Sequence, residues 1–298
     1  MNATHLFQGC GTALVTPFAP GGAVDEAAYR KFIRFQIEQG INFLVPCGTT
    51  GETPTLSRDE HLRLVRIAVE EAKAAPRRVP VLAGAGGNNT AHVAELARAL
   101  ETLGADGVLS VAPYYNKPTQ EGLFQHFSAV AAAVKLPVVL YNVPGRTCSN
   151  IEAATALRLA QVGNIVAVKE ASGNLTQIGA ILAAAPAKFA VISGDDALTL
   201  PMLALGAQGL ISVASNLIPG PMSEMVRLGL AGDYAKARSL HFEYLPLMEV
   251  NFIESSPGPV KCGLARMGHC QEVYRLPMVP VGEASRRRVF DVMQKVGL

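Results

Sequence analysis

Residues 165–169 read Ile-Val-Ala-Val-Lys, and this stretch decides the fold. It is a short, continuous apolar run with β-branched residues, which is typical of a strand buried on both faces of a parallel sheet. Similar runs recur along most of the chain, and longer amphipathic stretches separate them. Short apolar runs that alternate with helical patterns indicate parallel βα units.

The chain contains eight such runs. They span residues 12–15, 43–46, 79–83, 107–111, 138–141, 165–169, 190–193 and 209–212. Helical spacing of apolar residues marks connecting segments at residues 26–39, 58–74, 90–103 and 120–134. Eight strand–helix units in series predict an α/β fold of the closed (β/α)8 type, a TIM barrel, which commonly occupies about 250 residues.

The last part of the chain has a different pattern. Residues 219–298 contain no comparable strand signal and predict helices at 221–230, 234–249, 259–267 and 285–296. We therefore expect a (β/α)8 barrel with the catalytic site at residues 1–218, followed by a C-terminal helical extension at residues 219–298.

A doubly wound sheet is the competing α/β architecture. It usually carries a glycine-rich phosphate turn after its first strand. The nearest match, Gly-Ala-Gly-Gly-Asn-Asn at residues 84–89, follows the third run instead and has Asn89 in place of the last glycine. This pattern favours a tight turn followed by an asparagine or threonine helix cap.

Composition excludes several classes of protein. Hydrophobic residues form 49% and charged residues 17% of the 298 residues, so we expect a globular fold. The basic residues are scattered apart from three arginines at residues 286–288, and the net charge is +2, so no nucleic-acid partner is expected. No apolar run approaches the roughly 18 residues of a spanning helix, so we expect no membrane association.

The cysteines indicate a reducing compartment. They are five in number, widely spaced, at positions 10, 47, 148, 262 and 270. Residues 1–10 lack the basic start and the apolar stretch of a signal peptide, which predicts a cytoplasmic location. Cys262, His269 and Cys270 match no common zinc spacing, so we predict buried thiols there, with no metal and no cofactor.

Lys169 ends the sixth run and places an amine at the end of a buried strand. Lysine is rarely buried without a partner, and an amine in low-dielectric surroundings gives up its proton more readily, which favours Schiff-base formation with a carbonyl compound. The alternative is a structural lysine paired with Glu170 or another acid. Lys261, in the Pro-Val-Lys-Cys segment at residues 259–262, is the only rival among the nine lysines.

Polar residues gather after the predicted strands. Gly-Thr-Thr-Gly-Glu at residues 48–52 follows the second strand, Pro-Tyr-Tyr-Asn at residues 113–116 the fourth, and Tyr-Asn-Val-Pro-Gly-Arg at residues 141–146 the fifth. The carboxyl ends of barrel strands surround one site, so these residues are expected to meet Lys169 there. Tyr141 is the natural proton shuttle for imine formation. The Gly-Thr-Thr-Gly turn suits one carboxylate, and Arg146 suits a second.

These motifs resemble those of the dihydrodipicolinate synthase family, within the pyruvate-dependent N-acetylneuraminate lyase superfamily. The matching stretches appear in the family's order across nearly the whole predicted barrel, at residues 48–52, 113–118, 141–147, 168–170 and 193–196. The resemblance implies condensation of pyruvate with L-aspartate 4-semialdehyde on the way to diaminopimelate and lysine. It also implies a homotetramer built as a pair of tight dimers.

Carried over by position, the resemblance implies four catalytic residues. Lys169 forms the imine with pyruvate, and Tyr141 donates and accepts protons. Thr49 links Tyr141 to Tyr115, which reaches in from a neighbouring subunit and completes the relay only in a dimer.

The resemblance implies four further residues that bind substrate. Thr50 contacts the pyruvate carboxylate, Ile211 contacts pyruvate through its main chain, and Gly194 leaves space beside them. Arg146 binds the carboxylate of the semialdehyde. Arg146 is the residue that best distinguishes this family from the rest of the superfamily, because sialic-acid lyases and sugar-acid aldolases generally lack the Tyr-Asn-Val-Pro-x-Arg-Thr pattern.

The chain departs from the family pattern in three places. His92 stands where lysine-inhibited members carry an acidic residue, and Pro54 and Arg58 replace family residues near the Gly-Glu turn. A cationic effector loses its carboxylate there, so we hypothesise that feedback inhibition by lysine is weak or absent. Residues 255–259 read Ser-Ser-Pro-Gly-Pro in place of a common Asn-Pro-Ile-Pro, with no role assigned, and Cys47 is an unusual neighbour of the Gly-Thr-Thr-Gly turn.

Two other functions compete with this interpretation. One is a lyase or dehydratase of the same superfamily that acts on a 2-oxo sugar acid through the same lysine, and Arg146 argues against it. The other is a non-catalytic paralogue that binds a small oxo acid as a sensor. Retention of Lys169, Tyr141, Thr49 and Tyr115 argues against a sensor, which has no need of a proton relay.

Overall fold

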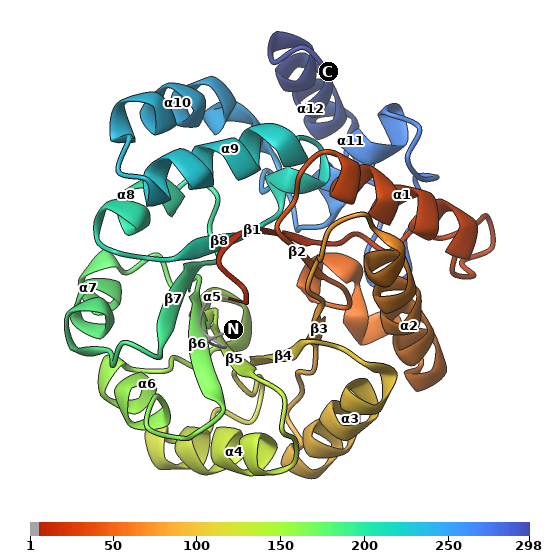
Figure 1. Cartoon of the computed structure of the whole chain (residues 1–298). Helices are drawn as coiled ribbons and strands as arrows, with labels where there is room; N and C mark the ends of the chain where they lie inside the picture. Colours follow the sequence, from red (N-terminus) through yellow and green to blue (C-terminus); the bar gives the residue numbers. More distant parts are fainter. Residues whose placement is uncertain (1–5) are drawn as a thin grey trace.

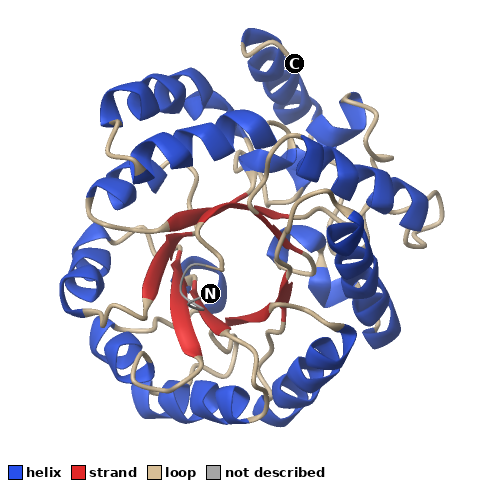
Figure 2. Ribbon diagram, viewed as in Figure 1, coloured by secondary structure: helices blue, strands red, loops and turns tan. Residues whose placement is uncertain are grey.

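A parallel eight-stranded barrel lies at the centre of the computed structural model, which describes residues 6–298 (Figures 1 and 2). The strands are β1 (Gly9–Ala13), β2 (Phe43–Val45), β3 (Leu82–Gly84), β4 (Gly107–Val111), β5 (Val138–Asn142), β6 (Ile165–Glu170), β7 (Ala190–Ser193) and β8 (Gly209–Ser212). The order in the sheet is β2-β1-β8-β7-β6-β5-β4-β3, so strands adjacent in sequence are neighbours and β1 pairs with β8.

The barrel closes between β2 and β3. An isolated parallel bridge joins Leu44 to Val81, and the Gly84 N–H donates to the Pro46 carbonyl at 3.0 Å. Glycine is required at position 84, because a Cβ there would lie 1.9 Å from the carbonyl oxygen of Cys47. The closed circuit confirms the predicted (β/α)8 fold class.

Helices surround the barrel in a ring (Figure 1). The helices of residues 6–298 are α1 (Glu26–Glu38), α2 (Arg58–Ala74), α3 (Thr90–Leu103), α4 (Gln120–Ala132), α5 (Pro144–Thr147), α6 (Ala153–Leu159), α7 (Leu175–Ala184), α8 (Thr199–Ala204), α9 (Pro219–Leu230), α10 (Tyr234–Val250), α11 (Gly258–Arg266) and α12 (Glu283–Lys295). Of these, α5 is drawn within the ring, and α10 and α12 lie outside it (Figure 1). Short 3₁₀ turns occur at η2 (Thr49–Gly51), η3 (Thr53–Thr55) and η4 (Ala214–Asn216). Asn89 caps α3 as predicted, since its side chain accepts from the N–H groups of Ala91 and His92.

The core has two parts. One apolar cluster fills the barrel and includes Phe43, Leu109, Val139 and Ile192, while a larger cluster lies between the strands and the helices. Side chains alternate between these clusters along each strand, because successive residues of a strand point to opposite faces. Residues near the end of a strand therefore face either the barrel mouth or the helix ring.

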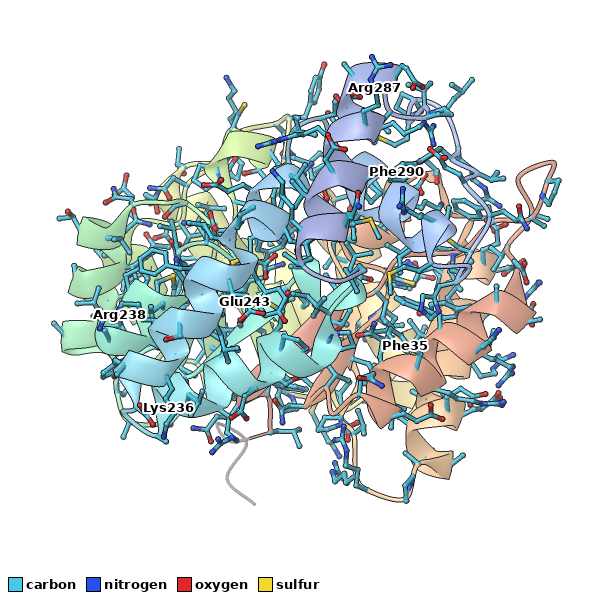
Figure 3. The ribbon with its side chains drawn as sticks, turned by 90° about the horizontal axis from the view of Figure 1, so that it is seen from above. Phe35, Lys236, Arg238, Glu243, Arg287 and Phe290 are labelled. Atoms are coloured by element: carbon cyan, nitrogen blue, oxygen red, sulfur yellow. The ribbon has the colours of Figure 1, made fainter. Side chains whose placement is uncertain are left out.

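The C-terminal extension, residues 219–298, covers one side of the barrel. Helix α9 packs on β1 and β8, α10 packs on α9, and α12 packs on α10 and α11. Figure 3 shows α12, with Arg287 and Phe290, above the layer that contains Lys236, Arg238 and Glu243 of α10. Because α9 takes the place of the eighth ring helix, the division at residues 218 and 219 stays a prediction rather than a visible boundary (Figure 1).

Most predicted bounds lie within one or two residues of the observed ones, and two strands differ more. The run predicted at residues 79–83 becomes β3 only from Leu82, because Pro80 lacks the N–H that a paired strand needs. The run predicted at residues 12–15 is shifted, since β1 begins at Gly9. The glycines at positions 9 and 11 have low strand propensity, which hid the start of this strand. Gly11 is nevertheless required there, because a Cβ would lie 2.1 Å from the Phe43 ring.

Candidate active site

A cavity of about 520 Å³ opens at the carboxyl ends of the barrel strands. Six of the eight residues predicted from the sequence line it: Thr49, Thr50, Tyr141, Arg146, Lys169 and Gly194. They come from β5, β6 and from loops after β2, β5 and β7, so the fold brings together residues that lie far apart in the chain. Tyr115 and Ile211 do not line the cavity.

Lys169 lies buried at the end of β6, with 6% of its surface exposed. It is in register with Tyr141 of β5, and its Nζ lies 4.1 Å from the centre of the Tyr141 ring. Within residues 6–298, Lys169 forms no ion pair. Its nitrogen is therefore available to a ligand in the cavity.

Glu170 does not pair with Lys169, which removes the structural alternative weighed from the sequence. Its carboxylate faces away and accepts hydrogen bonds from Asn142 Nδ2 and Ser172 Oγ. Burial raises the pKa of the Glu170 carboxyl. Successive strand residues point to opposite sides, so the amine of Lys169 faces the barrel mouth while this carboxylate faces the helix ring.

Gly194 makes room for the stem of Lys169. A Cβ at position 194 would lie 2.9 Å from Lys169 Cε and 2.8 Å from the side chain of Ala171. The sequence-based prediction gave Gly194 the role of leaving space beside pyruvate. The geometry adds a second requirement, because any larger residue would displace the amine itself.

The loop after β2, residues 48–55, forms two short 3₁₀ turns and is named here the 48–55 turn. Its own hydroxyls fix the backbone, since Thr53 Oγ1 donates to the Gly48 carbonyl at 2.8 Å and Thr55 Oγ1 donates to the Glu52 carbonyl at 2.9 Å. The hydroxyls of Thr49 and Thr50 make no hydrogen bond within residues 6–298, and both residues line the cavity. These two hydroxyls are thus left for a ligand.

Within residues 6–298, backbone strain is found in the loops that follow three of the barrel strands. Five non-glycine residues have positive φ, and all of them follow β2, β4 or β5: Cys47, Glu52, Tyr115, Lys117 and Cys148. Such conformations cost about 1–3 kcal/mol each and persist where surrounding structure enforces them, often at functional sites.

Arg146 supplies the cavity with a guanidinium group. It lies on the one-turn helix α5, is exposed, and forms no ion pair within residues 6–298. Asp195 is the only carboxylate among the lining residues, and its Oδ1 accepts backbone N–H groups of Ala197 and Leu198. With Lys169 and Arg146 facing it, the cavity favours small anionic ligands.

Tyr115 lies outside the cavity, and its aromatic side chain is unusually exposed. Its side chain is 88% exposed, φ is 71°, and no hydrogen bond joins it to Thr49 or Tyr141 within the described part of the chain. Ile211 is buried in the barrel interior, in the apolar cluster that also includes Tyr141. Its main chain belongs to β8, the strand beside β1.

Two residues of the C-terminal extension reach the cavity without having been predicted. Phe252 and Ser256 line it, the first 47% exposed and the second 5% exposed. The segment at residues 255–259, which has no assigned role in the sequence, thus supplies part of the wall. Only the Ser-Ser-Pro-Gly-Pro departure marked it. Cys47 also lines the cavity, and burial raises the pKa of its thiol.

Residues 6–298 contain neither a metal-binding cluster nor a helix that could span a membrane. No group of three His, Cys, Asp or Glu side chains is arranged to hold a metal ion. None of the helices combines the length and the apolar character needed to cross a bilayer.

The fold and the site together define a (β/α)8-barrel enzyme of the Schiff-base aldolase type, with a buried lysine and a phenol at the barrel mouth. The family model described as the dihydrodipicolinate synthetase family matches residues 6–296, and the chain belongs to this family. A 4-hydroxy-tetrahydrodipicolinate synthase of Koribacter versatilis is 57% identical over 292 residues, which cover 98% of this chain and 96% of the relative.

Solved structures agree with this assignment. Dihydrodipicolinate synthase from Aquifex aeolicus superposes with a TM-score of 0.95 at 43% identity, over 98% of this chain and 99% of that one. A chloride-inhibited dihydrodipicolinate synthase from Acinetobacter baumannii, solved in complex with pyruvate, also gives 0.95 at 43% identity, over 97% and 99% of the two chains.

Proposed function

We propose that this chain is a 4-hydroxy-tetrahydrodipicolinate synthase, which condenses pyruvate with L-aspartate 4-semialdehyde. The observation that carries the proposal is Lys169, a buried amine that faces the cavity beside the Tyr141 ring and has no carboxylate partner within residues 6–298. The names of relatives at 57% and 50% identity and the pyruvate complex of a structural neighbour support the choice of reaction.

In this reaction the Lys169 nitrogen adds to the ketone carbon of pyruvate, and loss of water gives an imine. Removal of a proton from the methyl group of the imine gives an enamine, whose carbon attacks the aldehyde. Tyr141, whose ring centre lies 4.1 Å from Lys169 Nζ, carries protons to and from these intermediates. Thr49 sits at the cavity wall, where its unbonded hydroxyl extends the relay.

The remaining residues hold the substrates. The Thr50 hydroxyl takes the pyruvate carboxylate, and the main chain of Ile211 supports pyruvate from β8. Gly194 keeps the space beside them open. Arg146, with a guanidinium that no carboxylate neutralises within the described residues, binds the carboxylate of the semialdehyde.

Tyr115 supports the proposal of an oligomer. An aromatic side chain that is 88% exposed and held at positive φ suits insertion into a neighbouring subunit, where its hydroxyl meets Thr49. We therefore propose a homotetramer built from tight dimers. Five free cysteines support a cytoplasmic location. Sedimentation velocity tests the assembly, and a Tyr115→Phe variant tests whether its hydroxyl enters the relay.

Reductive trapping tests the imine. Incubation with pyruvate and borohydride, followed by digestion and mass mapping, is expected to give a stable adduct on Lys169. Lys261 is the internal control, because it is also buried but is paired with Glu52. An adduct on Lys261 alone, or none at all, would reject the mechanism.

The acceptor aldehyde needs a separate assay. We expect L-aspartate 4-semialdehyde to react and sugar aldehydes to fail, because the Arg146 guanidinium lines the cavity and is proposed to bind a carboxylate that sugar aldehydes lack. An Arg146→Met variant should raise the KM for the semialdehyde about 100-fold and leave trapping of pyruvate intact. Preference for a sugar aldehyde would favour the other superfamily activities.

Lysine is expected to inhibit weakly or not at all. His92 and Pro54 are exposed, and Arg58 forms an ion pair with Glu95 at 2.9 Å, so these three positions offer an imidazole, a proline and a guanidinium rather than a carboxylate. Initial rates measured with increasing lysine test the hypothesis. A low-micromolar inhibition constant would refute it.

A further inference from the structure

A buried ion pair joins the 48–55 turn to the C-terminal extension, and the proposed mechanism makes no use of it. Lys261 Nζ, on α11, donates to Glu52 Oε1 at 2.7 Å, and both side chains are almost fully buried. The other carboxylate oxygen of Glu52 accepts the backbone N–H of Arg275 at 3.2 Å. Two contacts from the extension, more than 200 residues away, thus fix one residue of the turn.

Arg275 contacts the turn a second time. Its Nη1 donates to the carbonyl of Thr55 at 2.9 Å, and the same guanidinium grips Glu60 of α2 with two bonds of 2.6 and 2.7 Å. Glu60 also closes the capping box with Ser57 at the start of α2. The guanidinium therefore ties the end of the turn to the beginning of the next helix.

Phe18 completes this contact. Lys261 Nζ lies 4.2 Å and the Arg275 guanidinium carbon 4.4 Å from the centre of the Phe18 ring. These two cationic side chains thus contact the same aromatic residue, which lies in the loop after β1. The neighbouring Thr16 Oγ1 donates to the Gly51 carbonyl at 2.7 Å. The turn is thus held by the loop after β1 and by the extension, and not by β2 alone.

The position of the tethered residue gives these contacts a functional meaning. Glu52 has φ of 52° and is the C-cap of the turn Thr49–Gly51, with its N–H donating to the Thr49 carbonyl at 3.1 Å. A shift of Glu52 is therefore passed directly to Thr49 and Thr50, which present their hydroxyls to the cavity. Geometric errors of about 1 Å at such groups cost about 100-fold in rate.

We propose that Lys261 and Arg275 are positioning residues, which hold the 48–55 turn so that Thr49 and Thr50 meet pyruvate and Tyr141. This inference rests on the proposed function and assigns the C-terminal extension a part in catalysis. Neither residue lines the cavity. The rival interpretation, that the contacts only stabilise the fold, predicts loss of stability without a specific loss of pyruvate binding.

A matched pair of arginines separates the two interpretations. Arg275 pairs with Glu60, with side chains 19% and 22% exposed, and Arg286 pairs with Glu272 by two bonds, with side chains 27% and 21% exposed. Both arginines belong to the extension. Within residues 6–298, Arg286 makes no hydrogen bond or ion pair with the 48–55 turn.

The experiment compares Arg275→Met with Arg286→Met in the full-length protein. Melting temperature, kcat and the KM for pyruvate are measured, together with the rate of imine trapping by borohydride. We expect Arg275→Met to raise the KM for pyruvate about 10-fold and to slow trapping, while Arg286→Met stays within about 2-fold of the unmodified protein. Equal changes in both variants would overturn the proposal.

Milder substitutions keep the test decisive if Arg275→Met does not fold. Glu60→Gln preserves the capping box but weakens the grip on Arg275, and Glu272→Gln is its control. A larger KM change in Glu60→Gln supports the proposal, and equal effects refute it. Trapping of pyruvate on Lys169 in the unmodified protein is established first, so failure of the proposed function is seen before any variant is compared.

Discussion

Two buried lysines, Lys169 and Lys261, differ in the partner that each nitrogen meets. Lys169 is 6% exposed with its nitrogen 4.1 Å from the Tyr141 ring centre, and Lys261 is 0% exposed with its nitrogen 4.2 Å from the Phe18 ring centre. Burial and aromatic contact are thus nearly equal. Lys261 has a carboxylate at 2.7 Å, and Lys169 has none within residues 6–298.

The difference teaches that burial alone does not mark a reactive lysine. Burial lowers the pKa of Lys261, while Glu52 favours its charged form and occupies a hydrogen-bond direction of the amine. Lys169 faces a cavity, so its nitrogen can meet a ligand instead of a protein acid. One lysine is therefore suited to chemistry, and the other to holding a loop in place.

Replacing Lys169 by methionine should have the largest effect on activity. The variant loses the nucleophile, so kcat/KM is expected to fall at least about 10⁴-fold. Its stability should hold or improve, because the substitution removes a buried amine that has no acid partner within the described residues. Steady-state assays and urea unfolding measure the two quantities. Retained activity would contradict the prediction, since Lys169 would then have only a structural role.

Replacing Lys261 by methionine should produce the opposite pattern. Glu52 would be left as an unpaired buried carboxylate, which costs about 3–5 kcal/mol of unfolding free energy. The double variant Lys261→Met/Glu52→Gln should recover part of that loss, since no charge remains buried. Urea unfolding of both variants checks the prediction. Borohydride trapping on Lys169 is expected to become slower in Lys261→Met but not to be abolished, because the nucleophile is still present. A fully stable Lys261→Met protein would contradict it.

The sequence identified both lysines and favoured Lys169 as the reactive one, but it did not predict what Lys261 does. Periodicity located the eight strands, and the end of the sixth one placed Lys169 at the mouth, because strand alternation is a local property. The same sequence singled out Lys261 as the only rival. Its partner Glu52 lies 209 residues earlier, and no local pattern predicts such a contact.

The same limit divides the other residues of the site into those that the sequence predicted and those that it did not. Thr49, Thr50 and Arg146 follow strands and were predicted from that position, and they line the cavity. Ser256 comes from a helical extension that has no strand to mark it, so its place in the wall depends on tertiary packing. Tyr115 lies outside the cavity of one chain, and its proposed role concerns a second copy.

Two tyrosines sharpen the comparison further. Tyr141→Phe keeps the ring beside Lys169 but removes its hydroxyl, so the rate of imine formation should fall about 100- to 1000-fold while folding is unchanged. Tyr274→Phe is the control, since its ring lies 5.2 Å from Lys261 Nζ and its hydroxyl donates to the Gly258 carbonyl at 2.9 Å. That variant should lose about 1 kcal/mol of stability and little activity. Similar rates for the two variants would show that the Tyr141 hydroxyl carries no proton.

Acid should weaken the Arg275–Glu60 ion pair, which helps to hold the 48–55 turn that Lys261 also contacts. The hydrogen bonds from Arg275 lower the pKa of Glu60 from 4.5 to about 2. Because the folded-state pKa lies below the unfolded one, this stabilisation is complete above pH 4.5 and is lost as pH falls from about 4.5 to about 2. It amounts to an effect on the order of 2 kcal/mol.

Urea unfolding across this pH range measures that loss. Arg275→Met should show a shallower decline than the unmodified protein, because its Glu60 has no guanidinium to lose. Arg286→Met, which keeps the Arg275–Glu60 pair, should follow the unmodified protein through the part of the decline that Glu60 causes. Identical slopes for Arg275→Met and the unmodified protein would mean that the 48–55 turn is anchored mainly by the Glu52–Lys261 pair, and that the guanidinium adds little to it.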